Sequence, residues 1–262
     1  MLKYSLKTLK NPTLERLKAL QSVVNRKRKL SSKYDCASRL FKSKRSPAWR
    51  EIRDALKEAA PGGDACYYCE RDRYRDIEHI QPKRHYPQFT FIWENYVYAC
   101  TICNQDRKKD TYGIIDSTGK LVVFDRTHDM TVPIPVGVHA LINIRNEDPL
   151  DFLMLDLDTG MFVPIRTGID KIRGEFTRDL FDLNGSELPK YRRYARKSFE
   201  DFLQEYKKAV LSGDLTRIET VKREILSLPY PTVLVEMRRQ ATINPSLTLL
   251  FDGIPAEIGK RI

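Results

Sequence analysis

Two pairs of cysteines, each with the spacing Cys-x-x-Cys, constrain the fold of this chain more than any other feature. Cys66 and Cys69 form the first pair, and Cys100 and Cys103 form the second. Four thiolates complete a tetrahedral zinc site and leave no position open for a substrate. The spacing therefore predicts a structural zinc that fastens the two ends of the intervening segment. The alternative is four unrelated core cysteines.

The cysteines also bear on the cellular compartment. Four of the five fall in the two pairs, which a reducing compartment keeps as thiolates for metal rather than as disulfides. The fifth, Cys36, is expected to be a buried or half-buried free thiol. No apolar stretch approaches the roughly 20 residues of a membrane span, and residues 1–7 lack the apolar core of a signal peptide. We therefore expect a cytoplasmic protein that makes no contact with a membrane.

The charge of the chain favours a polyanionic partner. Lys and Arg number 46 against 35 Asp and Glu, which gives a net charge of +11. In a cytoplasmic chain, nucleic acid is the partner that such an excess fits best. Residues 25–50 hold ten of the basic residues and one acid, Asp35. This segment is expected either to contact phosphates or to form a solvated face.

The segment between the cysteine pairs, with the residue that follows them, carries groups suited to phosphodiester chemistry. Glu78 and His79 are adjacent, Asn95 lies further along, and Asn104 follows the last cysteine. A carboxylate, an imidazole and two amides can hold a divalent ion and activate a water against a phosphodiester. The sequence thus predicts a small active site stapled by zinc.

These residues fall into a pattern that resembles a known family. In chain order, the pattern is Cys66-x-x-Cys69, Ile77-Glu-His79-Ile-x-Pro82-Lys83, Trp93-x-Asn95 and Ala99-Cys-x-x-Cys-Asn104. It resembles the motif of HNH endonucleases in their zinc-stabilised ββα-metal form, over residues 64–110. The run Cys-x-Tyr-Cys-Glu, followed by Ile-Glu-His and Pro-Lys, is most similar to the PtuB-type HNH nucleases of Septu and retron anti-phage systems.

The resemblance implies a role for each residue of the pattern. His79 would be the general base that takes a proton from the attacking water, a role that suits an imidazole. Glu78 and Asn104 would hold the catalytic ion, and their hard oxygen donors favour Mg²⁺ or Mn²⁺ over zinc. Asn95 would brace the loop and help to orient the histidine.

Basic residues near the pattern are candidates for contacts to the nucleic-acid backbone. For each of them a solvated surface position is the alternative. The candidates are Lys83, Arg84, Arg107 and Lys108, together with Lys109.

Other titratable residues near the pattern are less defined. Asp76 is expected either to add a metal ligand or to be a surface charge, and His85 is expected to be a polar loop histidine. His128 and His139 lie outside the pattern and are assigned no role.

The pattern of apolar residues predicts an α+β protein in three regions. These are basic helices over 1–63, the zinc-clamped core over 64–112, and a mixed hairpin and helical part over 113–262. The expected helices are 13–30 capped by Thr13, one opening at Ser46-Pro47 and ended by Pro61-Gly62-Gly63, 169–180, 188–210 capped by Ser186, and 215–225. The expected strands are 119–125 and a hairpin of 152–157 with 161–165. The tail after Asn244 is weakly patterned and could dock on a partner.

The resemblance leads to a functional expectation. The chain would be the effector of an anti-phage complex that hydrolyses DNA with the help of a divalent ion. The resemblance also implies an ATPase chain as its partner. Any use of ATP must come from another chain, because no P-loop motif occurs in this sequence. Two alternatives stay open: a zinc-binding adaptor that binds nucleic acid without cutting it, and a structural subunit.

Overall fold

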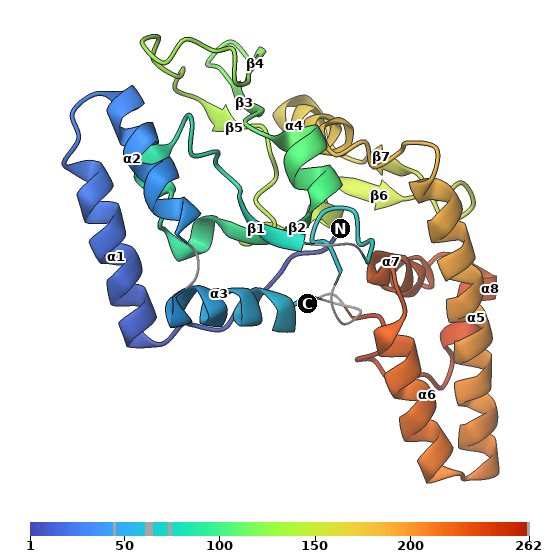
Figure 1. Ribbon diagram of the computed structural model, residues 1–262. Helices are drawn as coiled ribbons and strands as arrows, with labels where there is room; N and C mark the ends of the chain where they lie inside the picture. Colours follow the sequence, from blue (N-terminus) through green and yellow to red (C-terminus); the bar gives the residue numbers. More distant parts are fainter. Residues whose placement is uncertain (44–45, 61–64, 73–74, 261–262) are drawn as a thin grey trace.

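A computed structural model describes residues 1–43, 46–60, 65–72 and 75–260 of the chain. Helices gather at two sides of the molecule, and short strands lie between them (Figure 1). The N-terminal side holds α1 (Asn11–Asn25), α2 (Leu30–Lys42) and α3 (Pro47–Glu58). The structure therefore confirms the mixed α+β class.

The N-terminal helices differ from expectation in two respects. Thr13 does not cap α1 but lies inside it, and its hydroxyl donates a 2.6 Å hydrogen bond to Glu51 Oε2 on α3. The basic run forms a helix, α2, which buries Cys36 and Phe41 against the core. The helix expected at Ser46-Pro47 is confirmed, while its expected stop at Pro61-Gly62-Gly63 lies outside the described residues.

The central part has the predicted order of strand, loop, strand and helix. β1 (Arg75–His79) pairs antiparallel with β2 (Tyr96–Cys100), and His79 lies opposite Tyr96. Two turns of 3-10 helix, Pro87–Phe89 and Trp93–Asn95, lie in the loop between the strands. The helix that follows β2, Ile102–Lys108, is a π-helix, a rare form that is frequent at functional sites.

The next segment is rich in strands, as predicted. β3 (Tyr112–Ile115) lies between β4 (Leu121–Phe124) and β5 (Val138–His139) in a three-stranded antiparallel sheet. A two-stranded hairpin of β6 (Leu153–Leu155) and β7 (Phe162–Pro164) follows. Both the strand expected at 119–125 and the hairpin are confirmed.

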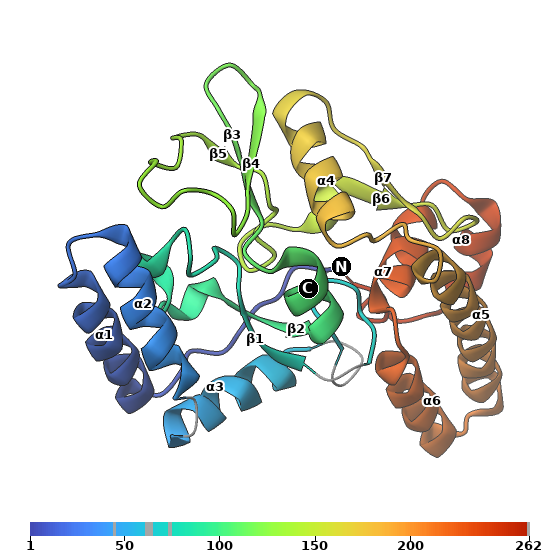
Figure 2. The same cartoon turned by 45° about the horizontal axis from the view of Figure 1, so that its top comes forward.

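Five helices complete the chain. They are α4 (Gly168–Leu180), α5 (Leu188–Ser212), α6 (Leu215–Ser227), α7 (Pro231–Gln240) and α8 (Pro245–Phe251). α5 and α6 pack side by side and are joined at Gly213, whose φ of 70° suits the residue after a helix end (Figure 2). Glu187, rather than Ser186, occupies the N-cap of α5.

The tail after Asn244 is part of the folded body rather than a loose segment. Leu247 and Phe251 of α8 are buried, and Ile258 beyond it is fully buried. The Arg238 guanidinium of α7 donates hydrogen bonds to carbonyls of the same tail. Docking of this tail on a partner, through its outer surface, stays a prediction.

One apolar cluster draws on all three regions of the chain. The Tyr4 ring stacks on Tyr67 and the Tyr68 ring stacks on Phe181, with 3.8 Å between ring centroids in each pair. Both pairs join the cysteine segment to parts of the chain that are distant in sequence. Among the helices described, none is long and apolar enough to cross a bilayer.

Candidate functional site

The four paired cysteines come together in the folded chain and are all buried. Their Sγ atoms lie within 4.8 Å of one another, and Cys69 Sγ is 3.7 Å from Cys100 Sγ. A disulfide would need about 2.05 Å, so these are separate thiols. Around a tetrahedral zinc with Zn–S bonds of about 2.3 Å, neighbouring sulfurs lie about 3.8 Å apart. The cluster can therefore hold a metal ion, and its donor set and spacing fit zinc.

The four thiols differ in pKa, because they are buried together and share hydrogen bonds. Burial raises the pKa of the Cys66 thiol, whereas hydrogen bonds from the other three thiols lower the pKa of Cys69. The Cys100 backbone N–H donates to Cys66 Sγ at 3.3 Å. A bound metal deprotonates coordinating thiols and replaces these sulfur–sulfur contacts with metal–sulfur bonds.

The residue after the first pair links the cluster to both ends of the chain. Glu70 adopts a left-handed φ of 61° and is buried. Its Oε1 atom lies 2.9 Å from the Met1 ammonium and accepts a hydrogen bond from Thr232 on α7. Next to it, Arg71 pairs with Glu187 at 2.8 Å.

A small polar cavity opens beside the end of β1. It has a volume of about 220 Å³ and is lined by Glu78 and His79 from β1 and by Asn104 from the π-helix. Side chains of neighbouring strand residues point to opposite faces. Both residues nevertheless line the same cavity, at the end of β1. The structure thus brings together three of the residues expected at the active site.

The His79 ring is buried and held in a defined orientation. Its Nε2 lies 2.9 Å from the Thr90 carbonyl oxygen, which also accepts a 2.7 Å hydrogen bond from the Tyr96 hydroxyl. The Phe41 ring packs on the imidazole with 4.5 Å between centroids. A nitrogen that donates to a carbonyl carries the proton, so the lone pair of the neutral ring is on Nδ1.

Lys108 lies in a different place from the one expected. Its side chain is fully buried, and Nζ donates 2.7 Å hydrogen bonds to Glu78 Oε1 and to the His79 carbonyl. A buried ammonium held by two oxygens does not reach a nucleic-acid backbone at the surface. The expected surface contact of Lys108 is therefore corrected to an internal ion pair with Glu78.

Asn95 braces the loop that follows β1. Its Oδ1 accepts a 2.8 Å hydrogen bond from the Gln81 backbone N–H. Its Nδ2 donates to the carbonyls of Gln81 and Phe89 at 3.1 Å and 3.0 Å. The side chain thereby holds both ends of the loop next to His79, which is the positioning that the sequence predicted.

The other expected basic contacts divide into two groups. Lys83 lines the cavity. Arg84, the next residue, donates a 3.2 Å hydrogen bond to the His128 carbonyl. Arg107 instead forms a 2.6 Å ion pair with Asp182 and also donates to the Phe181 carbonyl, so its guanidinium is engaged within the chain.

Sequence reasoning missed Arg126, which lines the cavity together with Lys83 and Lys109. Arg126 is exposed and comes from the segment between β4 and β5, remote in sequence from the cysteine pairs. No local pattern marks it, because only the fold brings that segment to the cavity.

The remaining titratable candidates lie outside the cavity lining. His85 is buried and its Nε2 lies 2.8 Å from the Asp110 carbonyl, which is a structural role. Asp76 accepts a 2.7 Å hydrogen bond from the Ile77 backbone N–H and is half-buried.

No protein-family model, curated protein or solved structure matches this chain.

Proposed function

We propose that the chain is a metal-dependent endonuclease of the HNH type that hydrolyses phosphodiester bonds in DNA. The main support is that His79, Glu78 and Asn104 line one polar cavity. Its volume of about 220 Å³ is below the roughly 300–1,000 Å³ of drug-sized ligand pockets. A cavity of this size suits a single phosphate group better than a whole nucleotide.

In this proposal His79 is the general base. Thr90 and Asn95 hold the ring and its loop, so that Nδ1 can accept a proton from a water beside the phosphate. The cationic side chains of Lys83, Lys109 and Arg126 would attract the phosphate oxygens and stabilise their charge during the reaction.

Two metal sites belong to the proposal. The four cysteines would hold a structural Zn²⁺, and the carboxylate of Glu78 and the amide oxygen of Asn104 would hold Mg²⁺ or Mn²⁺. Hard oxygen donors of this kind fit those ions, which commonly take their remaining ligands from water and substrate phosphate. Such an ion stabilises developing charge on the phosphate and on the leaving oxygen.

The resemblance to HNH proteins of anti-phage systems suggests the setting. We propose a cytoplasmic effector nuclease that works with an ATPase chain, as in Septu-like and retron complexes. The net charge of +11 supports nucleic acid as the substrate class.

One observation favours a second candidate, an adaptor that binds nucleic acid without cutting it. The Glu78 carboxylate is already paired with the buried Lys108 ammonium, a cation that competes with a divalent ion for the same oxygen. A resident ion pair at this position fits a site that has no catalytic metal.

Incubation of purified protein with supercoiled plasmid and Mg²⁺ or Mn²⁺ separates the two candidates. The endonuclease is expected to nick the plasmid, His79→Ala is expected not to, and His128→Ala, a histidine outside the cavity lining, is the matched control. The adaptor would be favoured if all three proteins bind the plasmid and none of them cuts it, even when the ATPase chain is added.

A further inference from the structure

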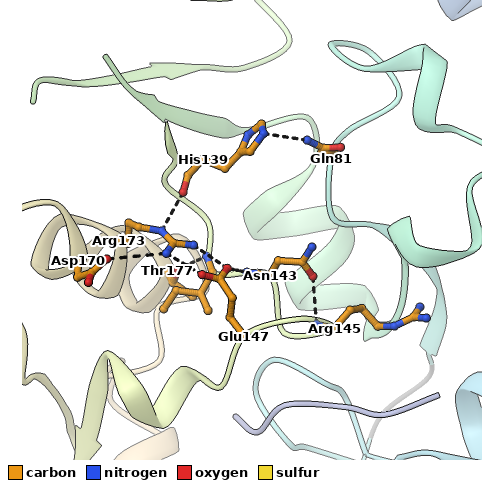
Figure 3. Close-up of polar contacts among 9 residues, drawn as sticks. Gln81, His139, Asn143, Arg145, Glu147, Asp170, Arg173 and Thr177 are labelled. Atoms are coloured by element: carbon orange, nitrogen blue, oxygen red, sulfur yellow. Dashed lines mark hydrogen bonds and ion pairs between the residues drawn. The ribbon is translucent and has the colours of Figure 1, made fainter. Parts of the chain in front are cut away.

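A second and larger cavity lies on the other side of the loop that follows β1. Its volume is about 530 Å³, within the range of ligand pockets. Its lining comes from the loop itself, from β5 and the segment after it, and from α4. Figure 3 shows its polar side chains, with Gln81 on one side and His139 facing it.

The residues after β1 form a partition between the two cavities. His79 and Pro82 line the small cavity, whereas Ile80 and Gln81, which lie between them in sequence, line the large one. Asn95 fixes this partition through its hydrogen bonds to both backbone groups of Gln81. One backbone segment, residues 79–82, therefore separates a molecule in the large cavity from the proposed catalytic base.

Two carboxylates, Glu94 and Glu147, and one guanidinium, Arg173, line the large cavity. Arg173 makes two hydrogen bonds to Glu147, of 2.7 Å and 2.6 Å, and its Nε donates to the His139 carbonyl at 3.0 Å (Figure 3). Partial burial, together with the positive charge of Arg173, lowers the pKa of His139, which favours the neutral imidazole. Because Glu147 compensates Arg173 and Glu94 adds a second carboxylate, the described residues of the lining hold no free cation for a phosphate and suit a ligand without negative charge.

The polar groups at the opening are of the kind that read the edges of nucleobases. Gln81 Nε2 lies 3.3 Å from His139 Nε2, and Asn143 also lines the cavity. Amide side chains offer a donor and an acceptor side by side, which is how Asn and Gln recognise bases. An imidazole adds one donor and one acceptor.

The walls of the cavity are mainly apolar and include two aromatic rings. Phe89 stands at the rim with 36% of its surface exposed, whereas Tyr112 is buried. Exposed aromatic rings serve as stacking platforms for unpaired bases. The apolar lining consists of Ile80, Phe89, Ile92, Tyr112, Val138 and Leu141.

We propose that this cavity binds a nucleobase of the substrate, unstacked from its neighbours, while a phosphate of the same strand occupies the small cavity. The inference rests on the proposed nuclease function. It implies that the protein acts on single-stranded or locally unpaired nucleic acid, because a base inside a duplex does not reach such a pocket.

Binding of nucleosides without phosphate tests the cavity independently of cutting. Adenosine, guanosine, cytidine and thymidine are titrated into the His79→Ala protein, with calorimetry or ligand-observed NMR as the readout. At least one is expected to bind, and Val138→Trp, which fills the cavity from a residue that is 43% exposed, is expected to weaken that binding by at least tenfold. Val136→Trp is the matched control, because Val136 is 94% exposed in the same segment and lies outside the cavity lining.

A second variant guards against local misfolding at β5. Phe89→Ala removes the ring at the rim and is expected to weaken nucleoside binding about tenfold. Absence of nucleoside binding, or equal binding by the Val138→Trp and Val136→Trp proteins, would overturn the inference.

Cutting assays then separate this inference from the proposed function. Val138→Trp is expected to slow the cleavage of a single-stranded oligonucleotide at least tenfold, whereas Val136→Trp, outside the cavity lining, is expected to cut it at the parent rate. Nucleoside binding without any cutting would support the pocket and contradict the nuclease. Cutting without nucleoside binding would support the nuclease and contradict the pocket.

Discussion

Lys108 Nζ and Glu78 Oε1 lie 2.7 Å apart in the interior of the protein, beneath the cavity that also holds His79. The lysine side chain is fully buried and that of the glutamate is 8% exposed. Removal of one partner from such a pair leaves an uncompensated buried charge, which costs far more than the pair itself contributes.

Lys108→Met is therefore expected to lower the free energy of unfolding by about 3–5 kcal/mol. The double variant Glu78→Gln/Lys108→Met is expected to be less destabilised than the sum of the two single variants, because it leaves no lone charge. Urea denaturation of the four proteins gives the coupling energy. Strictly additive effects would show that the two groups are not paired in solution.

Arg126→Met is expected to weaken DNA binding at low salt and to reduce the slope of log K against log salt by about 1, as for the loss of one phosphate contact. Arg126 is exposed and lines the small cavity. Lys208→Met removes an exposed cation of α5, a helix that contributes no residue to the lining of the small cavity, and is expected to leave the slope unchanged. Fluorescence anisotropy over a series of salt concentrations provides the measurement, and equal slopes for both variants would exclude Arg126 as a contact.

Cys103→Ser is expected to lose bound zinc and to unfold at ordinary temperatures, because structural zinc sites contribute about 10–16 kcal/mol in small domains. Cys36→Ser changes a buried thiol outside the cluster and is expected to retain the metal. Metal analysis of the purified proteins and thermal unfolding followed by circular dichroism report both properties. Equal zinc content in the two variants would mean that the cluster is not the metal site.

The ion pair between Glu147 and Arg173 in the large cavity predicts that the stability of the protein depends on pH in the acidic range. Burial alone would raise the pKa of Glu147, but hydrogen bonds from Arg173 and the Asn143 N–H outweigh it and lower that pKa below its ordinary value of 4.5. A depressed pKa means that the carboxylate stabilises the fold above pH 4.5 and that this contribution disappears as the pH falls through the lower, folded-state pKa. Glu147→Gln is thus expected to be less stable than the parent at pH 6 and to approach it near pH 3. Denaturant titrations across this range test the prediction, and a constant difference would contradict it.

Local spacing predicted those parts of the structure whose cause is local. The Cys-x-x-Cys pairs place two sulfurs at each end of one segment, and Asp158-Thr-Gly160 favours a hairpin between apolar runs. The helix α2 was not predicted, because attention to the basic residues of 25–50 passed over an apolar pattern. That pattern recurs at helical spacing at Leu30, Tyr34, Ala37 and Phe41.

Residue type predicted position poorly where tertiary contacts decide it. A lysine is usually exposed, and only the pairing of β1 with the π-helix shows that Lys108 is enclosed by Glu78 and the His79 carbonyl. Arg126 became a cavity residue through the path of the chain between β4 and β5. Neither outcome is encoded in a short motif.

The two stacked ring pairs have a consequence for protein engineering. Tyr67 and Tyr68 are neighbours in the first cysteine pair, and their stacking partners, Tyr4 and Phe181, lie far away on either side in sequence. Residues 64–112 excised as a minimal nuclease would therefore expose two large aromatic faces to water and would lose the anchor of Arg107 at Asp182. The segment that carries the proposed active site thus depends on the rest of the chain for its packing, and fusion or grafting designs must carry the whole chain.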